Sequence, residues 1–136
     1  VDFPRATHAY GLPERTVAHA LPLTVGREPY RLFNLDVFEY ALDHPMGIYG
    51  SVPFLHAHGS YGSQGLLWLN PSETFVDIGC AGSAATVDQG ASAVCSHWFS
   101  ASGTIDAFIF FGRTPDNVAW QHASLTGSTP LPPLFA

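Results

Sequence analysis

The chain has 136 residues and a formal net charge of −6, and its five basic residues are all arginines. Nucleic acids and anionic membranes favour clustered lysine and arginine, so neither is an expected partner. Hydrophobic residues make up 46% of the sequence and charged residues 12%, which argues against intrinsic disorder. The length suits one domain, and no apolar run approaches the ~20 residues that span a bilayer.

Short apolar segments punctuated by 11 prolines and 13 glycines predict an all-β chain. Their spacing of about 8–12 residues is typical of an antiparallel β-sandwich or barrel. The expected strands, in chain order, are 21–25, 30–34, 37–42, 54–58, 66–70, 74–78 and 105–111. The last of these is apolar at both alternating sets of positions, so we expect it to be a central strand that is buried on both faces.

One short helix is expected after the last strand. Thr114 can cap it, Pro115 suits its first turn, Asp116 suits the positive end of its dipole, and Gly127 can end it. The prolines that follow favour an extended linker over residues 129–136.

Residues 79–96 are rich in Gly, Ser and Ala and are expected to form a loop. Cys80 and Cys95 lie at the two sides of this loop and could form a disulfide. Closing a loop of ~15 residues would stabilise the fold by roughly 3 kcal/mol. Equally, the two cysteines could be unbonded small residues.

His56 and His58 point to the same side of the predicted strand 54–58, a geometry that can begin a zinc site. No third ligand stands at a suitable spacing, so no metal site is expected. The acidic residues Asp36, Glu39 and Asp43 favour a solvated surface over acid/base chemistry, since Glu39 should face away from Asp36.

Several distinctive stretches follow one another along the chain: YGLPER at 10–15, NLDVFEYALDHPMGIYGSVPF at 34–54, ETFVDI at 73–78 and ASLTGSTPLPPLF at 123–135. In this order they resemble segments of the N-terminal domain of family 31 glycoside hydrolases. The resemblance implies a galactose-mutarotase-like β-sandwich over residues 1–128, with residues 129–136 leading toward a catalytic barrel that this sequence does not contain. It also implies a retaining α-glucosidase with two catalytic carboxylates on that barrel.

The family's nucleophile motif, Trp-x-Asp-Met-Asn-Glu, has no counterpart in this sequence. We therefore expect no catalytic residue and no cofactor in the chain, and whether the parent protein is an active enzyme stays open. The expected function is an accessory domain that contributes a loop to the substrate pocket, with the parent's barrel and an α-glucoside as partners.

The resemblance assigns substrate-binding roles to Asp36 and Phe38 within NLDVF. A carboxylate can accept hydrogen bonds from paired sugar hydroxyls, and an aromatic face can cover the apolar side of a pyranose. Judged without the resemblance, Asp36 would be a turn or cap residue and Phe38 a core residue. Alternation along an expected strand would place the two side chains on one side.

Pro13 favours the branch of the family that removes glucose from N-linked glycans in the endoplasmic reticulum. That branch implies an endoplasmic reticulum or other secretory location and a possible non-catalytic β-subunit as partner. Arg15 departs from the pattern, because His usually follows the Glu of this motif.

The alternative function is a stand-alone carbohydrate-binding module. One charge-assisted pair of hydrogen bonds contributes roughly 1.5–3 kcal/mol and a half-open stack about 1 kcal/mol. Their sum does not clearly reach the ~4 kcal/mol of millimolar binding, so this alternative needs a pocket that the sequence does not reveal.

Overall fold

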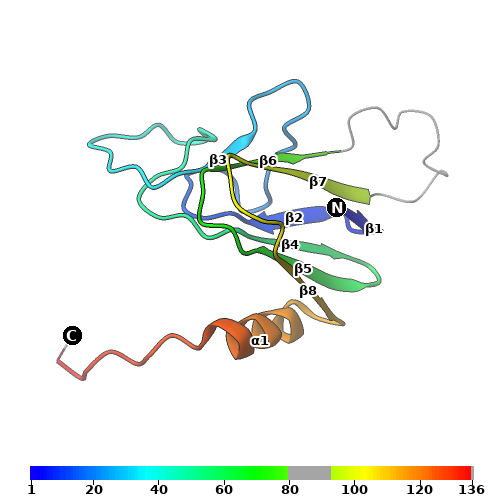
Figure 1. Cartoon of the computed structure of the whole chain (residues 1–136). Coiled ribbons are helices and arrows are strands. Elements are labelled where there is room, and N and C mark those ends of the chain that lie inside the picture. Colours follow the sequence, from blue (N-terminus) through cyan, green and yellow to red (C-terminus); the bar gives the residue numbers. More distant parts are fainter. Residues whose placement is uncertain (80–92, 136) are drawn as a thin grey trace.

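The computed structural model describes residues 1–79 and 93–135. Within these residues, eight strands form two four-stranded antiparallel sheets, and one α-helix follows the last strand (Figure 1). The predicted all-β sandwich with one short C-terminal helix is therefore confirmed.

The first sheet has the strand order β1-β7-β6-β3. Its strands are β1 (Asp2–Pro4), β3 (Tyr30–Leu32), β6 (Thr74–Ile78) and β7 (Ala93–Ser100). In β6, buried and half-buried residues alternate, as expected for a strand with one face on a core. The edge strand β3 pairs with β6, and the 33–53 loop, defined here as the connection from β3 to β4, begins at this edge.

The second sheet has the strand order β2-β4-β5-β8. Its strands are β2 (His8–Gly11), β4 (Phe54–Gly59), β5 (Gly62–Trp68) and β8 (Ala107–Gly112). A tight hairpin joins β4 to β5, and Gly62 has φ 129°, a conformation that side-chain-bearing residues avoid.

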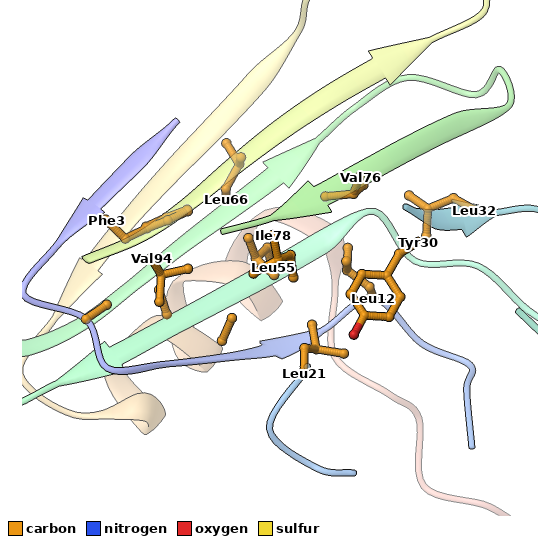
Figure 2. Packing of buried hydrophobic residues seen from close by; sticks show 13 residues of the cluster. Phe3, Leu12, Leu21, Tyr30, Leu32, Leu55, Leu66, Val76, Ile78 and Val94 are labelled. Atoms are coloured by element: carbon orange, nitrogen blue, oxygen red, sulfur yellow. The ribbon is translucent and has the colours of Figure 1, made fainter. Parts of the chain in front are cut away.

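The main hydrophobic core lies between the two sheets (Figure 2). Both sheets contribute its largest side chains, and so do the connecting segments; the cluster contains Phe3, Leu12, Leu21, Tyr30, Leu32, Leu55, Leu66, Val76, Ile78 and Val94. The hydroxyl of Tyr30 donates a hydrogen bond to the Pro22 carbonyl at 2.7 Å, so this large side chain is buried without an unpaired polar group.

Helix α1 (Pro115–Thr126) packs on the outer face of the second sheet, against β5 and β8 (Figure 1). The Thr114 side chain accepts a hydrogen bond from the Asn117 amide, and the Asn117 side chain accepts one from the Thr114 amide. Val118, with no exposed surface, is the buried anchor of the helix. The cap at Thr114, the proline in the first turn and the end at Gly127 are all as predicted.

Two predicted strands are not strands in the structure. Residues 21–25 and 37–42 have no ladder partner, although Leu21 does donate a backbone hydrogen bond to Ala9. The apolar side chains of 37–42 misled the prediction, because Phe38, Tyr40 and Leu42 face solvent rather than a core.

The predicted central strand 105–111 is also wrong in position. Strand β8 begins at Ala107 and lies at the edge of its sheet, and Ile105, Ile109 and Phe111 are exposed. Phe110 is buried and Phe108 half-buried under α1, so only one face of the strand is covered.

Strands β1, β2 and β7 were not predicted, and β5 begins at Gly62 rather than 66. The expected loop 79–96 overlaps β7, which begins at Ala93, and its residues 80–92 lie outside the described part of the chain. The predicted boundaries 1–128 and 129–136 are untested, although residues 127–135 contain no helix or strand.

Candidate functional site

The 33–53 loop carries the two residues to which the family resemblance assigns sugar binding. Asp36 is exposed, and the exposure of Phe38 is 112% of its reference value, which means that its ring touches almost nothing. The neighbouring Leu35 and Val37 are half-buried. The predicted strand is absent, but the alternation of exposure that it implied is present, and both candidate side chains project into solvent.

Backbone hydrogen bonds fasten the far part of this loop to the turn that follows β2. The Glu14 amide donates to the Gly50 carbonyl at 2.7 Å, and the Ile48 amide donates to the Glu14 carbonyl at 3.0 Å. Arg15 and Gly47 form an isolated antiparallel bridge between the same two segments. These bonds brace the loop and hold it in a defined position against the sandwich.

Thr16 fastens the middle of the loop. Its hydroxyl donates to the Ala41 carbonyl at 2.7 Å, and its carbonyl accepts from the Asp43 amide at 2.9 Å. Asp43 has φ 59°, the left-handed conformation that Asp tolerates better than most residues, so its backbone turns there. Asp36 and Phe38 lie in the part of the loop that comes before this fastening.

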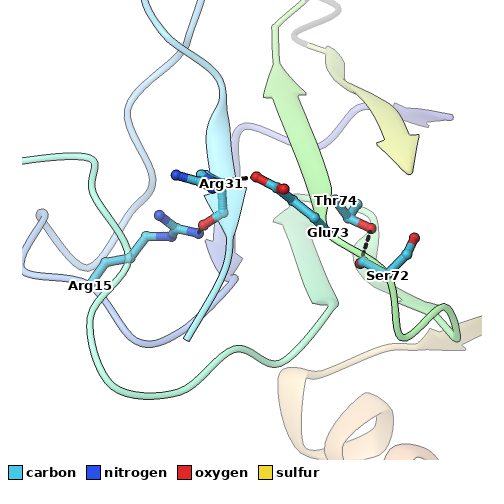
Figure 3. Close-up of polar contacts among 5 residues, drawn as sticks. All are labelled: Arg15, Arg31, Ser72, Glu73 and Thr74. Atoms are coloured by element: carbon cyan, nitrogen blue, oxygen red, sulfur yellow. Dashed lines mark hydrogen bonds and ion pairs between the residues drawn. The ribbon is translucent and has the colours of Figure 1, made fainter. Parts of the chain in front are cut away.

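The guanidinium of Arg15 joins three separate segments. It donates from Nε to the Leu12 carbonyl at 2.8 Å, from Nη1 to the Pro45 carbonyl at 2.6 Å, and from Nη2 to the Arg31 carbonyl at 2.6 Å. Figure 3 shows Arg15 reaching the backbone of Arg31 from the neighbouring segment. One side chain therefore ties the turn after β2, the 33–53 loop and strand β3 to each other.

Tyr30 lies beneath this guanidinium, with its ring centroid 5.0 Å from Cζ of Arg15. Burial lowers the pKa of Arg15 to about 10, and interaction with Tyr30 partly offsets that effect. Burial also raises the pKa of Tyr30, so the phenol stays neutral. Near neutral pH, Arg15 is therefore a cation whose charge is stabilised by three carbonyl dipoles and an aromatic face.

Arg31 continues the network on the outer surface of β3. Its side chain forms an ion pair with Glu73 (Figure 3). Its guanidinium lies 4.4 Å from the ring centroid of Phe33. Both partners of the ion pair are partly exposed, so solvent screens it and its contribution to stability is small. The pair joins β3 to the residue just before β6, beside the backbone pairing of the two strands.

Two hollows flank the loop where it leaves β3. The larger has a volume of about 690 Å³, and the smaller a volume of about 240 Å³; they share Phe33 as a common wall. The larger is lined by Leu32, Phe33, Asn34, Ser51, Pro53, Leu69, Asn70, Pro71, Ser72, Glu73 and Thr74. Its mixed apolar and hydroxyl-bearing wall is suited to covering a sugar or another segment of protein.

Two histidines considered from the sequence lie on β4. His58 shares a hydrogen bond of 2.7 Å with the Ser63 hydroxyl, and Nε2 of His56 is buried without a partner among the described residues. Burial, followed by the charge of His58, lowers the pKa of His56. Within residues 1–79 and 93–135, no three His, Cys, Asp or Glu side chains gather into a metal site.

The possible Cys80–Cys95 disulfide cannot be followed in the structure, because Cys80 lies outside the described residues. Cys95 is buried on β7. The helix found among the described residues, α1, has 12 residues and is too short to span a membrane.

Sequence reasoning missed the role of Arg15. The sequence did mark this position, since the family resemblance leads us to expect histidine after the Glu of YGLPER. Its three acceptors lie at positions 12, 31 and 45, however, and are backbone atoms that leave no trace in residue types.

Comparison with known proteins identifies the family of this fold. Residues 1–77 match the glycosyl hydrolase 31 N-terminal galactose mutarotase-like domain. Neutral alpha-glucosidase AB of Mus musculus is 44% identical over 148 residues, covering 100% of this chain and 16% of that protein.

Two solved structures of relatives have the same fold. A Tris-bound glucosidase II alpha subunit superposes with a TM-score of 0.85 at 41% identity, covering 96% of this chain and 15% of that one. An ER glucosidase II heterodimeric complex of a catalytic subunit and the binding domain of a regulatory subunit gives 0.78 at 40% identity, covering 90% and 14%. This chain belongs to the glycosyl hydrolase 31 N-terminal galactose mutarotase-like domain family.

Proposed function

We propose that this chain serves as the accessory domain of a family 31 α-glucosidase and that its 33–53 loop supplies Asp36 and Phe38 to the sugar pocket. The observation that carries this proposal is a loop braced at several points that nevertheless holds a phenylalanine at 112% exposure. Covering that ring would be favourable, and a pyranose offers a matching apolar face. The exposed carboxylate of Asp36 adds an acceptor for sugar hydroxyls.

In this proposal, the chain helps to bind and position the sugar, and it does not cleave the glycosidic bond. The sequence contains no counterpart of the family's nucleophile motif. The catalytic carboxylates would belong to a barrel toward which residues 129–136 would lead, and that barrel would cover the exposed apolar side chains of the loop and tail. The barrel is therefore the first partner of this domain.

The relatives suggest a more specific substrate and location. They are named neutral alpha-glucosidase and glucosidase II alpha subunit, and one solved relative is an ER enzyme with a regulatory subunit. We infer that the parent protein removes glucose from N-linked glycans in the endoplasmic reticulum lumen, together with a glucosidase II β-subunit. A bond between Cys80 and Cys95 would suit that oxidising compartment.

Kinetics of the natural protein that contains this chain would test the proposal. With an α-glucoside as substrate, Asp36→Asn should raise KM by about 10–100-fold, the loss expected for one charge-assisted interaction. Phe38→Ala should also raise KM. Glu39→Gln, at an exposed carboxylate three residues further on, is the matched control and should leave KM unchanged.

The 136-residue chain alone supplies the second test. It should not hydrolyse an α-glucoside, and turnover by the chain alone would contradict the proposal that the catalytic carboxylates belong to the barrel. Calorimetric titration of the chain with maltose should show no binding tighter than millimolar. Sub-millimolar binding would favour the stand-alone sugar-binding module, with the 690 Å³ hollow beside the loop as its pocket.

A further inference from the structure

Arg15 has a set of partners that is unusual for a charged side chain. Its three hydrogen bonds go to the backbone carbonyls of Leu12, Arg31 and Pro45. Among the described residues, the ion pair of the molecule joins Arg31 to Glu73 and does not involve Arg15. A half-buried cation that no carboxylate neutralises is costly to keep, and the carbonyls compensate for that cost only if all of them are in place.

The three carbonyls belong to segments that are distant in sequence. Leu12 belongs to the turn after β2, Arg31 to the edge strand β3, and Pro45 to the 33–53 loop. Leu12 has no exposed surface and Arg31 is paired along β6, so these two ends are fixed to the sandwich. Pro45 is the acceptor on the loop itself, so loss of the guanidinium would remove one of the loop's attachments, beside those made by Glu14 and Thr16.

We propose that Arg15 is the positioning residue of the 33–53 loop, setting where Asp36 and Phe38 stand relative to the sandwich. Its effect on sugar binding rests on the function proposed above, but its effect on the loop does not. Planarity makes the assignment specific, because a guanidinium offers several N–H donors in a rigid fork. Tyr30 beneath the fork holds its plane in place.

Neither of the near substitutes can reproduce this arrangement. Lysine has three donors on a single flexible nitrogen, and histidine has at most two ring N–H groups.

Amide hydrogen exchange on the 136-residue chain tests the structural part of the proposal. Arg15→Ala should make the protected amides of the loop, such as Ile48 and Asp43, exchange about tenfold faster, while amides of the β4–β5 hairpin keep their rates. Arg15→Lys keeps the positive charge and is the second variant in case the alanine variant fails to fold. Arg113→Ala, at an exposed arginine beyond β8, is the matched control and should change no loop rate.

The outcomes separate positioning from general stability. Loop rates that Arg15→Lys restores to those of the unchanged chain would overturn the assignment, because charge alone would then suffice. Equal acceleration in the loop and in the β4–β5 hairpin would also overturn it, since that pattern reports global unfolding. Faster exchange confined to the loop in both variants is the expected result.

The functional part is read from KM and kcat of the natural protein with an α-glucoside. A displaced loop should raise KM by about tenfold with less change in kcat, whereas partial unfolding would lower apparent kcat and leave KM unchanged. If the unchanged protein neither binds nor hydrolyses the sugar, the proposed function fails and the exchange result still decides the role of Arg15.

Discussion

Asn70 uses its whole side-chain amide in the connection between β5 and β6. Its Nδ2 donates to the carbonyls of Ser102 at 2.9 Å and Thr104 at 3.3 Å, and its Oδ1 accepts from the amide and the hydroxyl of Ser72. The residue is only 9% exposed. One buried amide thus joins the chain before β6 to the turn after β7.

Replacing Asn70 by alanine should lower the free energy of unfolding by about 1–3 kcal/mol, because the carbonyls and the amide around it lose their partner. Denaturant unfolding would measure this change. Asn34→Ala is the control, since Asn34 is exposed at the start of the 33–53 loop and should be nearly neutral. Equal stability of the two variants would contradict the role given to Asn70.

His56 should make stability depend on pH. Its folded-state pKa is lowered, first by burial and then by His58, so the unfolded chain binds its proton more readily. The free energy of unfolding should therefore fall as pH drops below about 6.5, the ordinary histidine value, toward the lowered folded value.

The variant His56→Phe should lessen that fall, because phenylalanine does not titrate and can pack beside Tyr10 and Phe54. The measurement is unfolding by denaturant at about pH 7 and about pH 5. His97→Gln, at an exposed histidine, provides the comparison. If the free energy of unfolding depends on pH as strongly in His56→Phe as in the unchanged chain, other titrating groups cause that dependence.

Sequence reasoning about single residues succeeded where chemistry is local. Thr114 was predicted as the cap from its residue type and from Pro115 and Asp116 after it, and its partner Asn117 stands only three positions away. Asp36 and Phe38 came from the family resemblance, and their roles stay predictions. Arg15 could not be assigned, because its acceptors are backbone atoms brought together only by the fold.

At the level of elements, helix α1 depends on its N-terminal cap and on the space that it fills on the second sheet. Val118 fills a space left by Gly65 on β5, where an added Cβ would lie 2.7 Å from Cγ1 of Val118. Thr114→Ala should lower the free energy of unfolding by about 1 kcal/mol, and Thr114→Ser should retain most of the cap.

Gly65→Ala should lower the free energy of unfolding by about 1–3 kcal/mol, because the added methyl group pushes the helix off the sheet.

Circular dichroism followed through denaturant unfolding would measure these changes. Ser124→Ala, on the exposed side of α1, is the control, because it leaves the backbone unstrained. Gly26→Ala would not serve, since Gly26 has φ 72°, a conformation that strains a residue with a side chain. A Gly65→Ala variant as stable as the unchanged chain would show that the helix does not rest on that point.

Strand prediction failed for identifiable physical reasons. Alternation and turn residues were enough to find β4, β6 and most of β8. Apolar residues on both faces of β8 predict a central strand, yet one of these faces is uncovered in the structure. Strands β1 and β2 are three and four residues long, too short to show a period.

For the molecule as a whole, as far as its residues are described, exposed large apolar side chains occur on several surfaces and are most numerous in two regions. One is the 33–53 loop, and the other is α1 with its tail, where Trp120 is 74%, Leu134 109% and Phe135 92% exposed. The tail runs away from the sandwich (Figure 1). Such surfaces are typical of sites covered by another protein surface.

We expect the 136-residue chain to self-associate as its concentration rises. Sedimentation velocity should show species heavier than 14.6 kDa, and a hydrophobic dye should bind. Combining Trp120→Ser with Leu134→Ser should shift the distribution toward monomer, while Ser124→Ala should not. A monodisperse monomer that binds no dye would argue against an uncovered interface.

The way in which the 33–53 loop is fastened has a consequence for how the protein can evolve. Arg15 and Thr16 hold the loop through the carbonyls of Pro45 and Ala41, and Glu14 holds it through the backbone of Ile48 and Gly50. These attachments use main-chain atoms of the loop, so most of its side chains are not needed to hold it in place. Substitutions at its exposed positions can then accumulate without detaching the loop from the sandwich, so its outer surface can change while the scaffold stays the same.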